Sequence, residues 1–204
     1  MTLKFYTNPM SRGRIARWML EEIGAPYETV VLDYATSMKA PEYLAINPMG
    51  KVPAIVHDGQ VVTEGAAICA YLAEAFPDAG LAPTAAERAA YYRWLFYAAG
   101  PVEQAVTNKS LGVTPTDKQR MMVGYDCFET MLDTLETAVS AHPFIAGDRF
   151  TAADVYVGSQ VMWGQAFGSM PKRDAFVDYA ARLAQREAYK RAAAIDDALM
   201  AKAA

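Results

Sequence analysis

The chain has 204 residues, of which 53% are hydrophobic and 21% charged, a composition typical of globular proteins with room for two small domains. The net charge of −4 argues against nucleic acid as the main partner, because phosphate binding needs clustered Lys and Arg. The two cysteines, Cys69 and Cys127, do not form a disulfide framework, and we expect neither a secretory signal nor a membrane-spanning stretch. These totals predict a cytoplasmic protein without a membrane partner.

The first 76 residues alternate between β-prone runs and stretches with helical periodicity. The expected strands are 3–7, 27–32, 52–56 and 61–62, and the expected helices are 11–23, 41–46 and 64–76. Gly24 follows the first helix in the position that favours a left-handed residue, and His57-Asp58-Gly59 forms a hairpin turn. The order β-α-β-α-β-β-α predicts a mixed four-stranded sheet in an α/β domain.

A turn-rich segment at 77–83 precedes a different pattern, in which helical stretches follow one another without a credible strand. The expected helices are 85–100, 117–141, 152–167 and 175–202. We therefore expect an N-terminal α/β domain at 1–77, a linker at 78–84 and an all-α domain at 85–204.

Three motifs in this order resemble the glutathione transferase superfamily, and together they cover nearly the whole chain. They are FYTNPMSRGRIARWMLEE, NPMGKVPAI followed by TEGAAI, and FIAGDRFTAADV. The resemblance, closest to bacterial-type cytosolic and serine-type members, implies a thioredoxin-like domain that binds glutathione and a helical bundle that holds an apolar electrophile. It also implies a homodimer with a role in detoxification.

In the family, the segment NPMGKVPAI leads to a cis-proline, matched here by Pro53. The cis bond would turn the backbone of Val52 outward, so that its N–H and C=O pair with the cysteinyl part of glutathione. Lys51 would meet the glycyl carboxylate, unless it is a solvated loop lysine. The alternative for the whole segment is a plain turn before a strand.

Thr63-Glu64-Gly65 stands at the start of a helix, whose free N–H groups suit the γ-glutamyl carboxylate. Glu64 would receive the ammonium group, or would only complement the helix dipole. The family usually has Ser or Thr where this chain has Gly65, which removes a hydroxyl hydrogen bond worth about 0.5–1.5 kcal/mol.

Ser11 is the first candidate for activating the sulfur, because it lies where the first helix begins and family members use a serine or cysteine at this turn. Tyr6, at the end of the first strand, is the rival, and a backbone or Asn8 contact is a third possibility. Ser11 would otherwise be a simple helix cap, and the two roles compete for one hydroxyl. Arg12 would stabilise the thiolate or lie exposed.

The third motif has a structural role. Thr151 and Asp154 have capping-box spacing and Phe150 serves as the hydrophobic staple, so Asp154 is expected to matter for folding and not for catalysis. The two cysteines are expected to be small buried hydrophobes. His57 and His142 do not have metal-ligand spacing, so no metal is expected.

For the apolar substrate, the resemblance points to residues near the cleft between the domains, although aromatic stripes more often belong to a core. The candidates are Met10, Tyr91, Phe96, Tyr97, Trp163 and Phe167. Glu103 or Gln104 would reach the glutathione of a partner subunit.

The predicted function is a glutathione S-transferase that ionises glutathione and conjugates its thiolate to an apolar electrophile. One alternative is a glutathione-dependent reductase, isomerase or dehalogenase on the same fold. Another is a non-catalytic binder of glutathione or apolar ligands. The set Ser11, Val52-Pro53 and Glu64 favours the enzyme, because a pure binder has no need of all of them.

Overall fold

The computed structural model describes residues 2–203, which form two compact units. The first unit runs to Ala82 and resumes at Gln185, and the second runs from Pro83 to Ala184. In the described part of the chain, every helix is too short or too polar to cross a membrane.

The first unit contains a four-stranded sheet in the order β2-β1-β3-β4. The strands are β1 Leu3–Thr7, β2 Glu28–Val31, β3 Ala54–His57 and β4 Gln60–Thr63. Strand β1 pairs parallel with β2 and antiparallel with β3, which pairs antiparallel with β4. The mixed sheet and its element order confirm the prediction.

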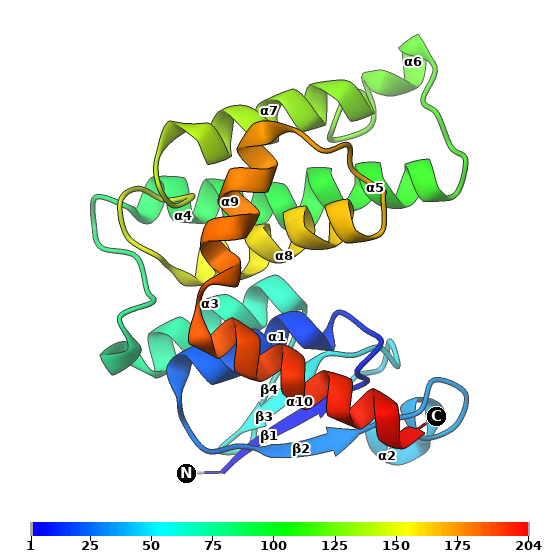
Figure 1. Cartoon of the computed structure of the whole chain (residues 1–204). Coiled ribbons are helices and arrows are strands. Elements are labelled where there is room, and N and C mark those ends of the chain that lie inside the picture. The colour runs from blue at the N-terminus through cyan, green and yellow to red at the C-terminus, as the bar shows by residue number, and fades with distance from the viewer. Residues whose placement is uncertain (1, 204) are drawn as a thin grey trace. The chain divides into compact units, whose positions relative to one another are not determined.

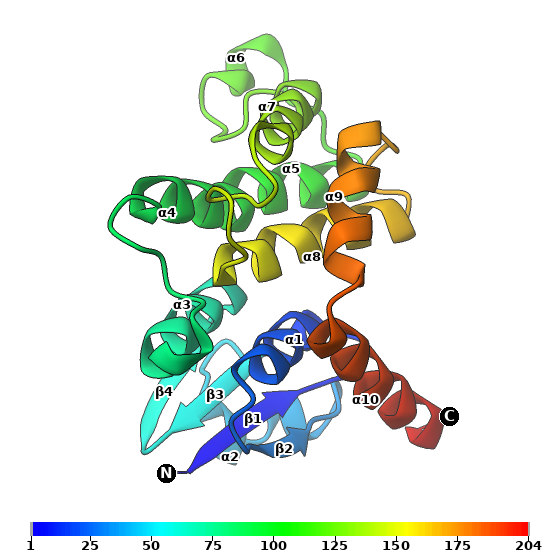
Figure 2. The ribbon, with the colours of Figure 1, turned by 60° about the vertical axis from the view of Figure 1, so that its left-hand side comes forward.

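Two helices, α1 (Gly13–Ile23) and α3 (Gly65–Ala75), lie side by side on one face of this sheet (Figure 1; Figure 2). Alternate residues of β1 point to this face, and Phe5 is fully buried there. On the opposite face, Tyr6 packs against Tyr43 of the short helix α2 (Pro41–Leu44). The 3₁₀ turns η1 (Ser37–Lys39) and η2 (Pro77–Ala79) complete the connections.

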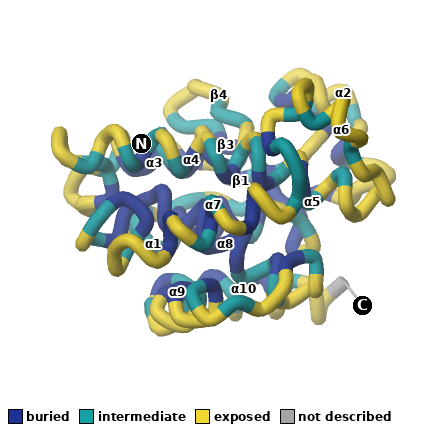
Figure 3. The backbone as a smooth tube through the Cα atoms, turned by 90° about the horizontal axis from the view of Figure 1, so that it is seen from above, coloured by how far each residue is buried: buried dark blue, intermediate teal, exposed yellow. Residues whose placement is uncertain are grey.

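The second unit is entirely helical among its described elements, as expected. They are α4 Arg88–Tyr97, the π turn η3 Ala98–Val102, α5 Glu103–Ser110, α6 Asp117–Arg120, α7 Phe128–Ala141, α8 Ala152–Ala166 and α9 Asp174–Ala184. Helix α8 forms the core of this unit, because its residues 152–161 are all buried (Figure 3). The predicted capping box is present: Asp154 accepts hydrogen bonds from the amide and the hydroxyl of Thr151.

Two predicted helix boundaries are wrong. The helix expected to end at Gly100 continues to Ser110, because the π turn accommodates Pro101 without ending the helix. The helix expected at 117–141 is interrupted between Arg120 and Phe128. Asp126 there adopts a left-handed φ of 58°, and Cys127 caps α7 by accepting from the Thr130 amide.

The stretch expected as one helix at 175–202 is also divided, into α9 and α10 (Glu187–Ala203). Helix α10 belongs to the first unit, where it packs along α1, whereas the sequence pattern placed it with the helical domain (Figure 1; Figure 2). Ion pairs between the two helices account for this position, since Arg17 and Asp196 are both buried and paired at 2.7 Å.

Candidate functional site

The register of the sheet brings three segments to one edge. Tyr6 of β1 lies opposite Ala54 of β3, which lies opposite Thr63 of β4. The loop after β1, the segment before β3 and the start of α3 after β4 therefore stand side by side. The distance from β1 across β3 to β4 is two strand spacings, or about 10 Å. A peptide of three extended residues has about this length, so it could reach all three segments.

The loop after β1 is closed by the side chain of Asn8. Its amide nitrogen donates to the carbonyl of Leu32 at 2.9 Å, and its oxygen accepts from the amide of Met10 at 2.9 Å. Both ends of this buried side chain are hydrogen-bonded within the protein, so Asn8 shapes the loop. Its amide nitrogen carries a second proton that these two bonds do not use.

Ser11 is half-buried and bonds the first amide of α1, one residue before the N-cap position at Arg12. Its hydroxyl accepts from the amide of Gly13 at 2.9 Å and donates its proton to the carbonyl of Asn8 at 2.6 Å. A hydroxyl has a single proton, so Ser11 donates to a bound sulfur only after that proton turns away from Asn8. One oxygen lone pair is already used by the cap, and the proton is the group that is available to redirect.

Tyr6 occupies a different place from Ser11, on the sheet face that packs against α2. Its ring centroid lies 5.5 Å from that of Tyr43, in a cluster with Leu32 and Met38 against which Val52 also packs. Burial raises the pKa of Tyr43 to about 12, and the nearby Tyr6 adds to the effect. These contacts give Tyr6 a role in supporting the segment before β3.

The peptide bond between Val52 and Pro53 is cis, as predicted. Among residues 2–203, neither the amide nor the carbonyl of Val52 has a hydrogen-bond partner. The preceding turn is held from within, since the hydroxyl of Tyr43 and the side-chain amide of Asn47 both donate to the carbonyl of Lys51. The segment before β3 therefore presents a backbone amide and a carbonyl that no other described residue pairs with.

Glu64 precedes α3 in an unusual conformation, with φ 66° and ψ 120°, and its side chain is exposed and does not cap the helix. A non-glycine residue in such a region costs about 1–3 kcal/mol and is found mainly at functional sites. Within residues 2–203, the amides of Gly65 and Ala66 have no acceptor. The start of α3 therefore offers free donors at the positive end of the helix dipole.

Three other predicted residues lie close to these segments in sequence and are exposed, namely Met10, Arg12 and Lys51. The apolar side chain of Met10 is 72% exposed. The hydroxyl of the exposed Tyr34 donates to its carbonyl at 3.4 Å. The first unit thus has apolar surface next to the Ser11 loop.

The aromatic candidates of the helical unit are divided between core and surface. Tyr91 is buried, and the hydroxyl of the half-buried Tyr97 donates to the carbonyl of Met131. Phe96 and Phe167 are 65% and 80% exposed. Trp163 contacts Phe167 edge-on, with 6.4 Å between the ring centroids.

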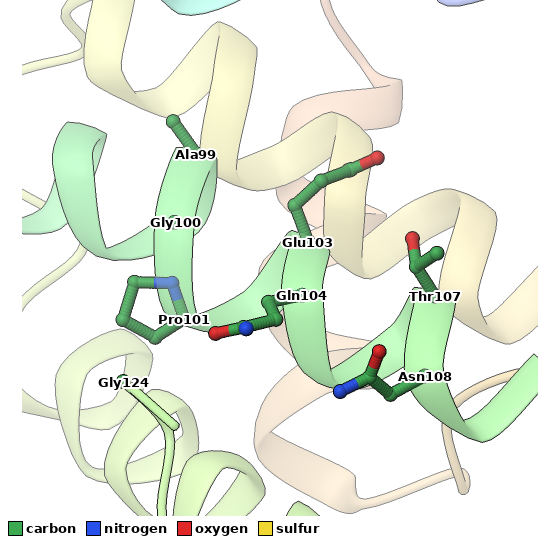
Figure 4. A pocket seen from close by; sticks show the side chains of 8 residues that line it. All are labelled: Ala99, Gly100, Pro101, Glu103, Gln104, Thr107, Asn108 and Gly124. Carbon is green, nitrogen blue, oxygen red and sulfur yellow. The ribbon is translucent and has the colours of Figure 1, made fainter. Parts of the chain in front are cut away.

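A pocket of about 470 Å³ lies in the helical unit, at the π turn and α5. Its lining includes none of these aromatic residues. In Figure 4, Pro101, Gln104 and Asn108 lie on the side of the helix that faces Gly124. Glu103 and Gln104 are the two residues expected to reach a partner subunit. The carboxylate of Glu103 accepts a hydrogen bond from the side-chain amide of Gln160 at 3.0 Å. Gln104 is exposed, whereas Glu103 is half-buried.

Sequence reasoning missed the residues that support the site, above all Tyr43 and Asn47. A signal for Asn47 was present, because Asn before Pro in a turn commonly bonds the backbone through its side chain. Tyr43 carried no such signal, since only the fold brings its hydroxyl to the carbonyl of Lys51.

Comparison with known proteins relates both units to the same family. Residues 1–74 match the model of the glutathione S-transferase N-terminal domain, and residues 85–194 match that of the C-terminal domain. Glutathione S-transferase GST-4.5 of Xanthomonas campestris is 34% identical over 175 residues, which cover 81% of this chain and 84% of the relative.

Solved structures agree with this relation. A glutathione transferase from Methylococcus capsulatus matches with a TM-score of 0.79 and 27% identity, covering 96% of this chain and 99% of the other. A Sulfitobacter homologue with bound glutathione matches with a TM-score of 0.74 and 27% identity, covering 98% and 99%.

Proposed function

Since the chain belongs to the glutathione S-transferase family and is a glutathione transferase, we propose that it binds glutathione across the three segments at the edge of its sheet. The cysteinyl part pairs with the free amide and carbonyl of Val52. The γ-glutamyl carboxylate accepts from the amides of Gly65 and Ala66, and Glu64 receives the ammonium group. Lys51 meets the glycyl carboxylate.

The observation that carries this proposal is the pairing register, which sets Val52 between the Ser11 loop and the tip of α3. The unpaired backbone of Val52 and the uncapped start of α3 are complementary to an extended tripeptide with a carboxylate at one end. The strained Glu64 stands between them, at a position where strain indicates function.

In the proposed chemistry, the hydroxyl of Ser11 turns from the carbonyl of Asn8 to the sulfur and stabilises the thiolate. A free thiol with a pKa of about 8.5 is only a few per cent ionised at neutral pH, and a shift of two units needs about 2.7 kcal/mol. A hydrogen bond to a charged acceptor supplies about 1.5–3 kcal/mol, which accounts for most of that difference. The N-terminal dipole of α1 and Arg12 add to it.

The thiolate then attacks an electrophilic carbon, forming a sulfur–carbon bond as the leaving group departs with the bonding electrons. We assign the apolar contacts to Met10 in the first unit and to Phe96, Tyr97, Trp163 and Phe167 in the second. The enzyme works as a homodimer in the cytoplasm, where its two free cysteines stay reduced.

Turnover of glutathione with a chromogenic aryl halide tests the assignment of Ser11. We expect Ser11→Ala to lower kcat/KM about ten- to hundredfold, from the loss of one charged hydrogen bond. Ser11→Thr retains the hydroxyl both for the sulfur and for the amide of Gly13, so it should keep most of the activity. Tyr6→Phe should change activity little, because Tyr6 packs on the other face of the sheet.

Ultraviolet titration of the bound thiol gives the direct test. In the native protein the thiol should titrate below its free pKa, and in Ser11→Ala it should return toward it. Loss of activity in Tyr6→Phe with full activity in Ser11→Ala would transfer the role to Tyr6.

A further inference from the structure

Ion pairs join α10 to α1, and residues that come early in α1 pair with residues that come late in α10. Arg14 and Arg17 lie in the first half of α1 and pair with Asp197 and Asp196 in the second half of α10, both at 2.7 Å. At the other end, Glu21 pairs with Arg191 at 3.2 Å. The opposed order fits only an antiparallel alignment, and both views show α10 lying along α1 (Figure 1; Figure 2).

The pair of Arg17 and Asp196 anchors this alignment. Both side chains are 1% exposed, and the guanidinium of Arg17 also donates to the hydroxyls of Tyr27 and Thr29 and lies 5.0 Å from the ring centre of Phe5. Losing one partner of a buried pair strongly destabilises the protein, so the second half of α10 is held in place beside the first half of α1.

Arg14 joins this helix end to the loop that carries Ser11. One terminal nitrogen donates to Asp197, and the other donates to the carbonyl of Pro9 at 3.4 Å. Pro9 is buried and lies in the turn that the Ser11 hydroxyl closes by donating to the carbonyl of Asn8. A single planar guanidinium therefore ties the loop to a carboxylate 188 positions further along the chain.

We propose that Asp197 of the C-terminal helix is a positioning residue for the thiol-activating loop, and that it acts through Arg14 and the carbonyl of Pro9. The inference rests on the proposed role of Ser11. Asp197 holds one terminal nitrogen of the guanidinium at 2.7 Å, and the planar group directs the other terminal nitrogen to the carbonyl of Pro9 at 3.4 Å. Without the carboxylate, Arg14 swings toward solvent and the loop loses its outer contact.

The experiment compares Asp197→Asn with Arg191→Gln in the full chain. Both variants remove one ion pair between α1 and α10, but only the first one touches the loop. Because Asp197 is 60% exposed, we expect a modest change of about two- to fivefold in the thiolate fraction of bound glutathione and in KM for glutathione. Asp197→Glu should restore both, and Arg191→Gln should change neither while lowering the melting temperature comparably.

Amide hydrogen exchange without glutathione separates this proposal from that for Ser11. The amides of Ser11 and Gly13 bond within the loop, so their exchange should accelerate in Asp197→Asn and not in Arg191→Gln. Faster exchange would support the positioning role even if Ser11→Ala leaves the bound thiol unchanged and so refutes the role of Ser11. Unchanged exchange and titration in Asp197→Asn, or equal effects in Arg191→Gln, would overturn the positioning role.

Discussion

Gly13 is the residue at which the structure makes its sharpest prediction. It begins α1, is buried, and lies so close to β1 that a β-carbon there would stand 2.0 Å from the hydroxyl oxygen of Thr7. The same carbon would lie 2.9 Å from the hydroxyl oxygen of Ser11 and 3.1 Å from the β-carbon of Thr7. The change Gly13→Ala therefore pushes the first turn of α1 away from the strand that precedes it.

The size of the effect follows from how little these neighbours can move. Thr7 is fully buried and branched at the β-carbon, so one of its two other staggered rotamers brings the methyl group to the same place. Its own β-carbon stays at 3.1 Å in every rotamer. Overpacking of this kind costs about 1–3 kcal/mol, whereas Gly→Ala inside an open helix gains about 0.5–1 kcal/mol. The clash outweighs the gain in helix propensity, so we expect net destabilisation of about 1–2 kcal/mol.

Urea unfolding of Gly13→Ala, Thr7→Ala and the double variant measures this effect. The double variant should be more stable than the sum of the single changes predicts, because Thr7→Ala removes the atom at 2.0 Å. Activity should fall in Gly13→Ala as well, since the amide that bonds the hydroxyl of Ser11 moves with the helix.

Gly100→Ala is the control for added volume, because a β-carbon there meets no atom within 4 Å apart from its chain neighbours and its own helix backbone. It should cost less than Gly13→Ala, the remaining cost being the contact of the new β-carbon with the ring of Pro101. If Gly13→Ala unfolds at the same urea concentration as the wild type, or if the two changes at Thr7 and Gly13 are additive, the reasoning from close approach is refuted.

Three further predictions concern other parts of the molecule. Asp154→Asn should lower the free energy of unfolding in urea by about 2–4 kcal/mol. Each oxygen of the buried carboxylate accepts two hydrogen bonds, and the NH₂ group that replaces one oxygen in Asn cannot accept its two. Hydrogen bonds from Arg120 lower the pKa of Asp126 to about 2, so Arg120→Gln should raise its midpoint in an NMR titration. Burial raises the pKa of the Cys69 thiol, so a disulfide reagent should modify only Cys127 in the native protein.

Each of these predictions has an opposing outcome. A variant Asp154→Asn with wild-type stability would remove the capping box as a folding determinant. For Asp126, the lowered pKa means that the ion pair is present above the ordinary carboxyl pKa and lost as the pH falls through about 2. A midpoint unchanged by Arg120→Gln would assign the shift to other groups. Reaction of native Cys127→Ser with the reagent would contradict the burial of Cys69.

The sheet could be predicted from sequence because its signals are local. The run Leu3–Thr7 ends at Asn8-Pro9, and the hairpin between β3 and β4 turns at Asp58-Gly59, both of which are strong turn signals. The order of the elements also predicts which segments lie together. The loop after β1, the segment before β3 and the start of α3 are all connections at the same edge of the sheet.

The helix boundaries depended on information that a local pattern does not contain. Pro101 normally ends a helix, but the π turn at 98–102 absorbs it, and the spacing of apolar residues does not distinguish the two outcomes. The interruption before α7 is equally hidden, because Asp126 in a left-handed conformation is stabilised by Arg120 and by the hydroxyl of Thr130.

The packing of α10 against α1 could not be predicted from the sequence, and the reason is physical. The charges of α1 and α10 are ordinary on either helix alone, since helix surfaces are commonly charged. Only their opposed order makes an antiparallel pair favourable, and only burial makes the pair of Arg17 and Asp196 expensive to break. A neighbouring long-range pair, Arg14 with Asp197, is the one that we propose to position the Ser11 loop, because Arg14 also donates to the carbonyl of Pro9. The hydroxyl of Ser11 can therefore be found from a local feature of the sequence, whereas the carboxylate that we propose to position its loop lies 186 positions further along the chain.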